Sequence, residues 1–363
     1  MTLKAKEIAE MIGVSQATLS LVINNRPGIS EKTRSRVIAE LKQRGFDYLL
    51  SPETVSAPVE SPAPVIERRL GFVTYRIGGE LLGFNSFFPL IVQGIENAAS
   101  REQYSVTYLN IDRERADDGI RQLRSSGCAG YVIFATELKE IDLTPFEKLG
   151  VPFVILDNYF VSHAINTVKV NNERGTYAAV EHLVGMGHRK IGYLRSGVDI
   201  NSFEERFHRA MDAMYRLGCE NPEKYVYEIG YPSDHAAEGM KKLLDEKVEL
   251  PTAFIGDNDL VVAGAMRAVQ MAGYSVPNDM SFVGFDDRPV CEWMVPALTS
   301  VRLPRERFGG EAVNLLLRML EGESDIALKI EINPDLVVRQ SVLKVEVSPE
   351  LIERSSVARN KAE

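Results

Sequence analysis

The sequence predicts a small all-α helix-turn-helix head joined to an α/β body of two doubly wound subdomains. Three observations support this fold class. The first 50 residues carry only helical patterns, a proline-rich stretch follows at 51–68, and beyond it apolar runs alternate with amphipathic segments. Because prolines at this density are incompatible with a helix interior or a sheet centre, we expect residues 51–68 to form a linker.

The head is expected to contain three short helices. Thr2, Ser15 and Ser30 are suitable N-cap residues, and Gly13 and Gly45 suit the left-handed position that ends a helix. The apolar positions expected to form the core are Ile8, Ala9, Ile12, Leu19, Val22, Ile23, Val37, Ile38 and Leu41. Two helices joined by a tight turn and closed by a third predict a helix-turn-helix unit.

The body is expected to contain parallel sheets covered by helices, because its apolar runs are continuous rather than alternating. The runs are residues 70–75, 106–111, 131–135, 153–157, 191–194, 225–229, 253–256 and 282–285, with a shorter one at 167–170. Helical segments at 175–186 and 264–272 end at Gly187 and Gly273. So many strand–helix units favour two doubly wound subdomains with a cleft between them.

This pattern gives the predicted domain boundaries. They are a head at 1–50, a linker at 51–68, a ligand-binding domain at 69–341 and a tail at 342–363. Within the ligand-binding domain we expect an N-terminal subdomain at about 69–163 and 297–326, and a C-terminal subdomain at about 164–296 and 327–341.

Charge is divided unevenly along the chain. The net charge is −9, but residues 1–50 hold eight Lys or Arg against five Asp or Glu, a balance of +3 that leaves −12 for the remainder. A basic head on an acidic body is typical of a protein with a nucleic-acid-binding module.

Several function classes are disfavoured. Cys128, Cys219 and Cys291 form no CxxC pair, so we expect a reducing compartment and no disulfide framework. The chain shows no signal peptide and no apolar run of ~18–20 residues, which predicts a cytoplasmic protein without a membrane partner. P-loop, HExxH and GxSxG motifs are missing and the histidines lack metal-like spacing, so we expect no catalytic residues, cofactor or metal.

The residues at 14–46, VSQATLSLVINNRPGISEKTRSRVIAELKQRGF, strongly resemble the head of the LacI/GalR family of bacterial regulators, whose pattern is VSxxTVSxVxN followed by SxKTR. Further matches cover most of the chain. They are GHRKIGYL at 187–194, AFIGDNDLVVAGAMRA at 253–268, VPNDMSFVGFDD at 276–287 and PALTSVRLP at 296–304. The resemblance implies a body like a type I periplasmic binding protein, and a homodimer that binds a roughly palindromic double-stranded DNA operator.

The start of the second helix is expected to enter the major groove, where glutamine pairs with adenine and small apolar groups contact thymine methyls. The resemblance implies that Gln16, Ala17 and Leu21 read bases. It also implies that phosphates are held by Ser15, Thr18, Asn24, Lys32 and Thr33. Leu21 replaces the arginine of well-known members, so a methyl contact is expected there.

The hinge departs from the family. Members commonly follow the head with a YxPNxxARxL helix that inserts a leucine into the minor groove, whereas this chain has FDYLLSPETVSAP. Leu49 or Leu50 could act as the wedge, but Pro52 and Pro58 oppose a helix there. We therefore expect a weak or absent hinge helix.

Open α/β sheets bind ligands beyond the carboxyl ends of their strands, so residues at these ends are expected to converge on the cleft. The candidates, each also implied by the resemblance, are Phe87, Phe88, Asp157, Arg206, Asn258 and Asp286. Tyr231 and Trp293 are candidate aromatic walls. These groups suit a hydroxyl-rich ligand.

The sequence therefore predicts a bacterial, nucleoid-associated repressor controlled by a small, sugar-like effector. Alternatives are a regulator that answers to a purine or to a protein co-repressor, and a sugar-binding transport module, which would need a signal peptide and no DNA-binding head. The tail at 342–363 lacks the leucine heptads of tetrameric family members, so a dimer is expected.

Overall fold

The computed structural model describes residues 5–24, 26–46, 49–50, 68–77, 87–323 and 326–345, apart from the side chain of Glu31. Residues 1–67 and 68–363 form two compact units, the head and the body, and each is described by itself. All of the predicted linker except Arg68 lies outside the described residues, as do Thr2 and the tail beyond 345.

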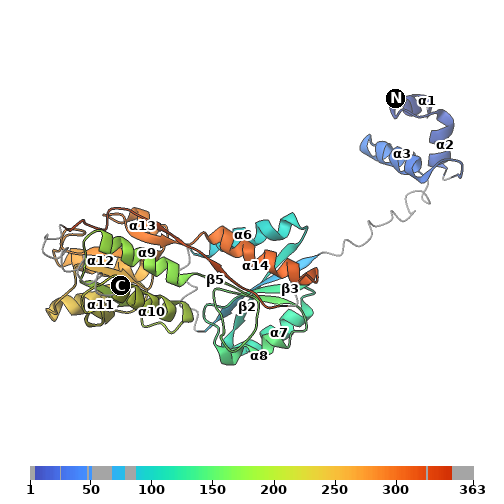
Figure 1. Cartoon of the computed structure of the whole chain (residues 1–363). Coiled ribbons are helices and arrows are strands. Elements are labelled where there is room, and N and C mark those ends of the chain that lie inside the picture. Colours follow the sequence, from blue (N-terminus) through green and yellow to red (C-terminus); the bar gives the residue numbers. More distant parts are fainter. Residues whose placement is uncertain are drawn as a thin grey trace, which may run out of the picture. The chain divides into compact units, whose positions relative to one another are not determined.

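The head is the predicted three-helix unit (Figure 1). Its helices are α1 Ala5–Met11, α2 Gln16–Ile23 and α3 Glu31–Gln43. Gly13 and Gly45 have φ values of 64° and 75°, which only glycine adopts at little cost. The nine predicted core positions are buried, except Ile23 and Ile38, which are half-buried.

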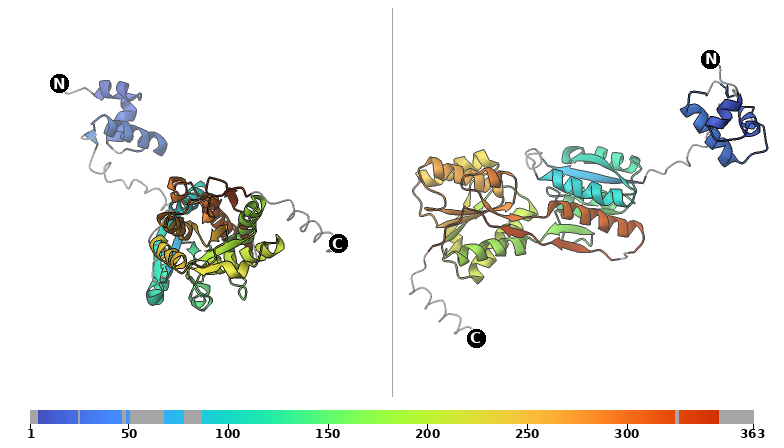
Figure 2. Two further views of the ribbon diagram at one scale, coloured as in Figure 1. Left: turned by 90° about the vertical axis from the view of Figure 1, so that its left-hand side faces the viewer. Right: turned by 90° about the horizontal axis from the view of Figure 1, so that it is seen from above.

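The body contains two six-stranded sheets (Figures 1 and 2). Sheet A has the order β11-β5-β4-β3-β1-β2 and is parallel throughout; sheet B has the order β12-β10-β9-β8-β6-β7 and is parallel except for β12. The strands of sheet A are β1 Arg69–Arg76, β2 Ser105–Asp112, β3 Gly130–Phe134, β4 Phe153–Leu156, β5 Thr167–Val170 and β11 Lys329–Ile332. Those of sheet B are β6 Ile191–Arg195, β7 Val226–Glu228, β8 Ala253–Gly256, β9 Ser281–Asp286, β10 Thr299–Arg302 and β12 Asp335–Val337.

Helices cover both faces of each sheet. The α-helices are α6 Phe88–Arg101, α7 Ala116–Ser125, α8 Thr144–Glu147, α9 Asn172–Gly185, α10 Asn201–Arg216, α11 Ser233–Asp245, α12 Asp259–Met271, α13 Val290–Trp293 and α14 Arg305–Leu320. Short 3₁₀ turns occur at Arg113–Arg115, Glu140–Asp142 and Pro222–Tyr225. On sheet A, α6 and α14 pack on one face and α7 and α8 on the other; on sheet B, α9 and α10 oppose α11 and α12. The predicted fold class is thus confirmed.

The chain crosses between the subdomains at places other than those predicted. The predicted boundaries assign β5 and β11 to the C-terminal subdomain and β10 to the N-terminal one. Instead, β5 pairs with β4 and β11 pairs with β5 in sheet A, whereas β10 pairs with β9 in sheet B. Each crossing comes one strand later than predicted, because β5, β10 and β11 pair with strands that already lie in the sheet before the chain leaves it.

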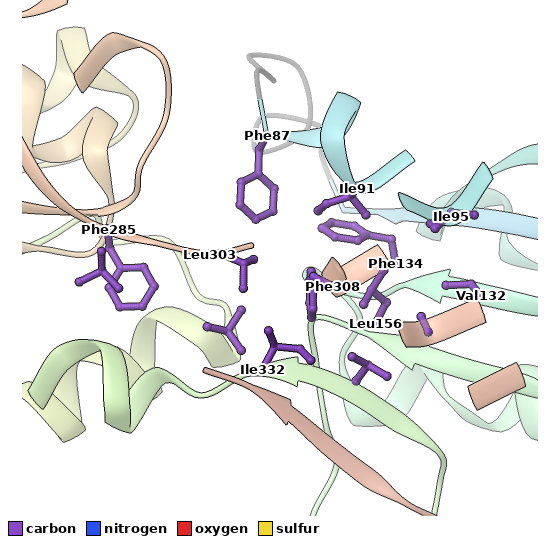
Figure 3. Packing of buried hydrophobic residues seen from close by; sticks show 14 of the residues in the cluster. Phe87, Ile91, Ile95, Val132, Phe134, Leu156, Phe285, Leu303, Phe308 and Ile332 are labelled. Atoms are coloured by element: carbon purple, nitrogen blue, oxygen red, sulfur yellow. The ribbon is translucent and has the colours of Figure 1, made fainter. Parts of the chain in front are cut away.

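Strands β10, β11 and β12 were not predicted. They are three or four residues long, and β11 and β12 expose charged residues at the edges of their sheets, which weakens the apolar signal. The largest apolar cluster runs through both subdomains. Figure 3 shows Phe134 and Leu156 on the sheet A side and Phe285 on the sheet B side, with Phe87 between them.

Candidate functional site

The amino-terminal ends of α2 and α3 are built in the same way. Ser15 Oγ accepts a hydrogen bond from the Thr18 amide at 3.1 Å, and the two hydroxyls lie 2.8 Å apart. Ser30 and Thr33 repeat this arrangement at 3.2 and 2.8 Å. Such helix ends present backbone N–H groups and hydroxyls, which suit the binding of phosphate oxygens.

The predicted base-reading residues lie on α2. Gln16 and Ala17 are exposed, and Leu21 is half-buried. Asn24 caps the end of α2, where its Nδ2 donates to the Ser20 carbonyl at 2.9 Å. Lys32 is exposed in the first turn of α3. The exposed side chains of α2 are therefore free to meet base edges.

The leucine proposed as a minor-groove wedge has another position. Leu50 is buried in the head core, with 7 % of its surface exposed, and Leu49 packs against the same cluster. A buried side chain cannot insert between bases without leaving this core. Residues 51–67, including Pro52 and Pro58, lie outside the described residues.

In the body, one cavity of about 40 Å³ brings together all six residues that were expected to converge, although Phe87 and Phe88 lie at the start of α6 and Arg206 lies within α10. It is lined by Phe87, Phe88, Phe134, Thr136, Asp157, Ile200, Ser202, Phe203, Arg206, Asn258, Asp286 and Arg288. This volume holds one or two water molecules and is far below the roughly 300–1,000 Å³ of ordinary ligand sites. The structure therefore shows a narrow cleft whose side chains must move apart to admit a ligand.

Asp286 is the electrostatic centre of this cavity. Its carboxylate, at the end of β9, lies 3.1 Å from Arg206 Nη2 and 3.3 Å from Arg288 Nη2. Arg206 also donates to the Asn172 side chain at 3.0 Å and to the Asp257 carbonyl at 2.7 Å. Each nitrogen of the Arg206 guanidinium thus has a protein partner, which holds this group rigidly.

Asp157 faces the cavity from the end of β4. Its Oδ2 accepts a hydrogen bond from Thr136 Oγ1 at 2.6 Å. Burial raises the pKa of Asp157 to about 6, although the Thr136 hydrogen bond and the positive charge of Arg206 act in the opposite direction. Asp157 and Asp286 have φ values of 69° and 102°, a left-handed region that costs non-glycine residues energy and is concentrated at functional sites.

The two residues after β8 have different roles. Asn258 Oδ1 caps α12 by accepting from the amides of Leu260 and Val261 at 3.0 and 3.2 Å. Asp259 is buried and accepts from Ser300 Oγ at 2.6 Å and from the Arg288 amide at 2.7 Å. Burial and the neighbouring charge of Asp286 raise the pKa of Asp259 to about 7.

Two phenylalanines at the start of α6, Phe87 and Phe88, line another part of the cavity. Phe88, the first residue of α6, packs edge-on against Phe134 with 4.6 Å between ring centroids. The guanidinium carbons of Arg288 and Arg305 lie 5.6 and 5.8 Å from the centre of the Phe87 ring. The cavity therefore combines apolar ring faces with charged groups that offer directional hydrogen bonds.

The prediction that Trp293 forms a wall of the site is wrong. Trp293 is 79 % exposed and does not line the cavity. In the short helix α13 the buried Cys291 faces the core, and a residue two positions later points to a different side. Tyr231 is buried beside the cavity rather than among its lining residues.

Sequence reasoning missed other lining residues, which are Phe134, Thr136, Ile200, Ser202, Phe203 and Arg288. Thr136 follows a predicted strand, so the strand-end argument could have included it. Arg288 stands two residues beyond Asp286, the last residue of β9, so the same argument could have included it. Within the described residues, no helix is both long and apolar enough to span a membrane.

Comparison with known proteins matches both units. The family model of bacterial regulatory proteins, lacI family, matches residues 4–47, and that of the periplasmic binding protein-like domain matches residues 180–342. The HTH-type transcriptional repressor PurR of Aliivibrio fischeri (strain MJ11) is 30% identical over 348 residues, covering 93% of this chain and 98% of the relative. PurR of Aliivibrio salmonicida (strain LFI1238) is 28% identical over 342 residues, with the same coverage.

Solved structures show the same architecture. The lac repressor dimer bound to operator and the anti-inducer ONPF is similar with a TM-score of 0.70 and 25% identity, covering 94% of this chain and 100% of that one. The complex of the transcriptional regulator CelR with cellobiose gives a TM-score of 0.68 and 24% identity with the same coverage, a likeness of fold.

Proposed function

Because this chain belongs to the lacI family of bacterial regulatory proteins, and is therefore a DNA-binding transcriptional repressor with an effector-binding domain, we propose that a small hydroxylated effector in the body cavity controls its operator affinity. Its relatives are repressors rather than enzymes. A bacterial repressor acts where the chromosome lies, so we place this protein in the cytoplasm, on the nucleoid.

The head supplies the contacts to DNA. We assign base reading to Gln16, Ala17 and Leu21 on α2, since this helix presents its first turns to solvent. Phosphate contacts fall to the capped helix ends and the residues around them, namely Ser15, Thr18, Asn24, Lys32 and Thr33. Leu21 offers only an apolar contact, which suits a thymine methyl.

One observation carries the effector proposal, which is that side chains from the carboxyl ends of strands in both sheets line a single cavity. Asp157 and Phe88 come from the sheet A side, and Asn258 and Asp286 from the sheet B side. Carboxylates and amides hydrogen-bond hydroxyls, and the faces of phenyl rings pack against the apolar faces of small ring compounds.

A ligand that contacts both sides favours one arrangement of the two subdomains over another. The ligand shifts this equilibrium only by its differential affinity for the two arrangements. The head precedes β1 of sheet A in the sequence, so the N-terminal subdomain is the part to which the linker attaches. We infer that subdomain movement is passed to the heads in this way.

We propose that the working unit is a homodimer, by analogy with the lac repressor dimer on its operator. One head contacts few phosphates, and a two-fold symmetric protein matches a palindromic site. Sedimentation equilibrium at micromolar concentration should give twice the chain mass of 40.5 kDa. A monomeric mass would contradict this part of the proposal.

The effector site is tested by thermal-shift screening of sugars and purine bases with the full chain. At 100 times its Kd, a ligand adds about 2.7 kcal/mol to native stability. Asp157→Asn keeps the size of the side chain and an acceptor for Thr136, yet should remove most of the ligand-induced shift. Asp234→Asn, an exposed residue paired with Arg267, is the control that should keep it. A hit that is unaffected by Asp157→Asn would place the effector elsewhere.

A further inference from the structure

Arg288 is a buried arginine with an unused donor. It is 6 % exposed, it lines the cavity, and its Nε and Nη2 approach Asp286 Oδ2 at 3.4 and 3.3 Å, which are long contacts. Among the described residues, its Nη1 has no hydrogen-bond partner. A buried donor without an acceptor has lost its hydrogen bonds to water, so an acceptor supplied from outside would bind there favourably.

The neighbouring arginine makes the contrast clear. Arg206 directs its Nε, Nη1 and Nη2 to Asn172, the Asp257 carbonyl and Asp286 at 2.7–3.1 Å. Its ring contact with Phe285, 3.7 Å from guanidinium carbon to ring centre, fixes it further. Arg206 therefore braces the site, whereas Arg288 retains a free binding edge.

A second donor stands beside Arg288. The Tyr231 hydroxyl is buried and also lacks a hydrogen-bond partner of good geometry among the described residues. Burial raises the pKa of Tyr231, whereas the positive charge of Arg288 and hydrogen bonding with the Asn258 and Arg288 side chains act in the opposite direction, so Tyr231 lies close to both. Tyr231 does not line the cavity as it stands, so its hydroxyl can reach a ligand only when the cavity widens to admit one, and it would then join the Arg288 N–H as a second donor for one oxyanion.

The charges leave room for such an anion. Among the described residues, Asp286 is the only carboxylate that forms an ion pair with either Arg206 or Arg288. The buried Asp259 also acts on Arg288, but its pKa is raised to about 7, so its negative charge is easily lost. Asp157 faces the same cavity, but its raised pKa of about 6 means that it can be neutralised by protonation at little cost.

We propose that the effector of this protein carries an oxyanion, either a carboxylate or a phosphate, and that Arg288 and Tyr231 bind it. The proposal rests on the effector site proposed above and specifies its ligand class as sugar acids or sugar phosphates. Arginine suits this role because the planar arrangement of its guanidinium N–H groups matches the oxygens of both carboxylate and phosphate. Hydrogen bonds from a charged donor to a charged acceptor are also stronger than those between neutral groups.

The test compares neutral and anionic members of matched compounds with the full chain at constant ionic strength. The probes are glucose, gluconate and glucose 6-phosphate; galactose and galacturonate; and ribose and ribose 5-phosphate. Thermal shift finds the binders and calorimetry gives their Kd values. Comparing the Kd values of the carboxylate probes with those of the phosphate probes shows which of the two oxyanions the site binds.

Two variants test the residues. Arg288→Gln should weaken binding of the anionic probe about 10- to 100-fold, which is the range for loss of charge-assisted hydrogen bonds. Tyr231→Phe keeps the ring, removes an unpartnered hydroxyl and should weaken it about tenfold without loss of stability. Arg302→Gln, which removes an exposed arginine paired with Asp287 outside the cavity, is the matched control and should bind as the wild type does.

Three results would overturn the proposal. They are equal binding of the neutral and anionic members, full anion affinity in both variants, and stabilisation by none of the anionic probes. A neutral binder that is lost in Asp157→Asn but kept in Arg288→Gln would refute the oxyanion and leave the effector site intact. A ligand unaffected by Asp157→Asn would instead count against the site itself.

Discussion

Replacing Asp286 by alanine is expected to lower the free energy of unfolding of the body by about 3–5 kcal/mol. The carboxylate side chain is 6 % exposed, and it neutralises two guanidinium groups that are 4 % and 7 % exposed. Removing the carboxylate leaves both positive charges buried without an ion-pair partner. Alanine also stays at a φ of 102°, so the change brings no backbone relief.

The measurement is urea unfolding at pH 7.5, followed by circular dichroism. Asp234→Ala is the matched control, because Asp234 also pairs with an arginine, Arg267 at 2.8 Å, but both side chains are exposed. That pair should contribute no more than about 1 kcal/mol. Adding Arg288→Leu to Asp286→Ala should recover part of the loss, since one uncompensated charge disappears. A loss below about 1 kcal/mol for Asp286→Ala, or a larger loss in the double variant, would refute this electrostatic reasoning.

Three further predictions concern packing, pH dependence and DNA reading. A Cβ at Gly94 would lie 1.9 Å from the Glu306 carbonyl oxygen, whereas a Cβ at Gly310 would lie 3.5 Å from its nearest neighbour. Gly94→Ala should therefore lower the free energy of unfolding by about 1–3 kcal/mol, and Gly310→Ala should leave it unchanged. Equal melting temperatures for the two would contradict the close packing of α6 on α14. The pKa of Asp259 is about 7 in the folded protein and 3.8 in its ordinary state, so the folded protein binds this proton more tightly than the unfolded chain does. The free energy of unfolding should therefore fall as the pH rises from about 4 to 7. Asp259→Asn should therefore gain stability relative to the wild type between pH 5 and 7.5 in urea unfolding, and a constant difference would show that the carboxyl is not protonated when folded. Gln16→Ala should cost about 1–3 kcal/mol on operator DNA and little on random DNA in anisotropy titrations, whereas equal losses would exclude base reading.

The candidate site could be predicted from the sequence where position along a strand decides it. Phe88, Asp157, Asn258 and Asp286 follow or begin elements whose ends must meet in a parallel sheet, and they do meet at one cavity. The position of Arg288 depends on Asp286 and Asp287, both with positive φ, which turn the chain back toward the cavity. Sequence patterns carry no signal for such a turn in aspartates.

The features of the fold that the sequence did not predict also depend on contacts between distant segments. Helices and buried strands are repetitive, so their apolar periods identify them, and the capping serines Ser15 and Ser30 mark where α2 and α3 begin. Which sheet β5, β10 and β11 join is decided by pairing between distant segments, such as β11 with β5. Leu50 likewise lies in the head core because of tertiary packing, although its sequence position suggested a role at the hinge.

The central claim is that occupation of the body cavity changes the affinity of the head for its operator. It is tested most directly by selecting the operator from a random DNA library with the full chain, then titrating that DNA with and without a saturating cavity ligand. We expect the ligand to change the operator Kd by about 5- to 150-fold, the usual range of coupling between two sites, and we expect Asp157→Asn to abolish that change. An operator Kd that stays the same while the ligand fills the cavity would contradict it.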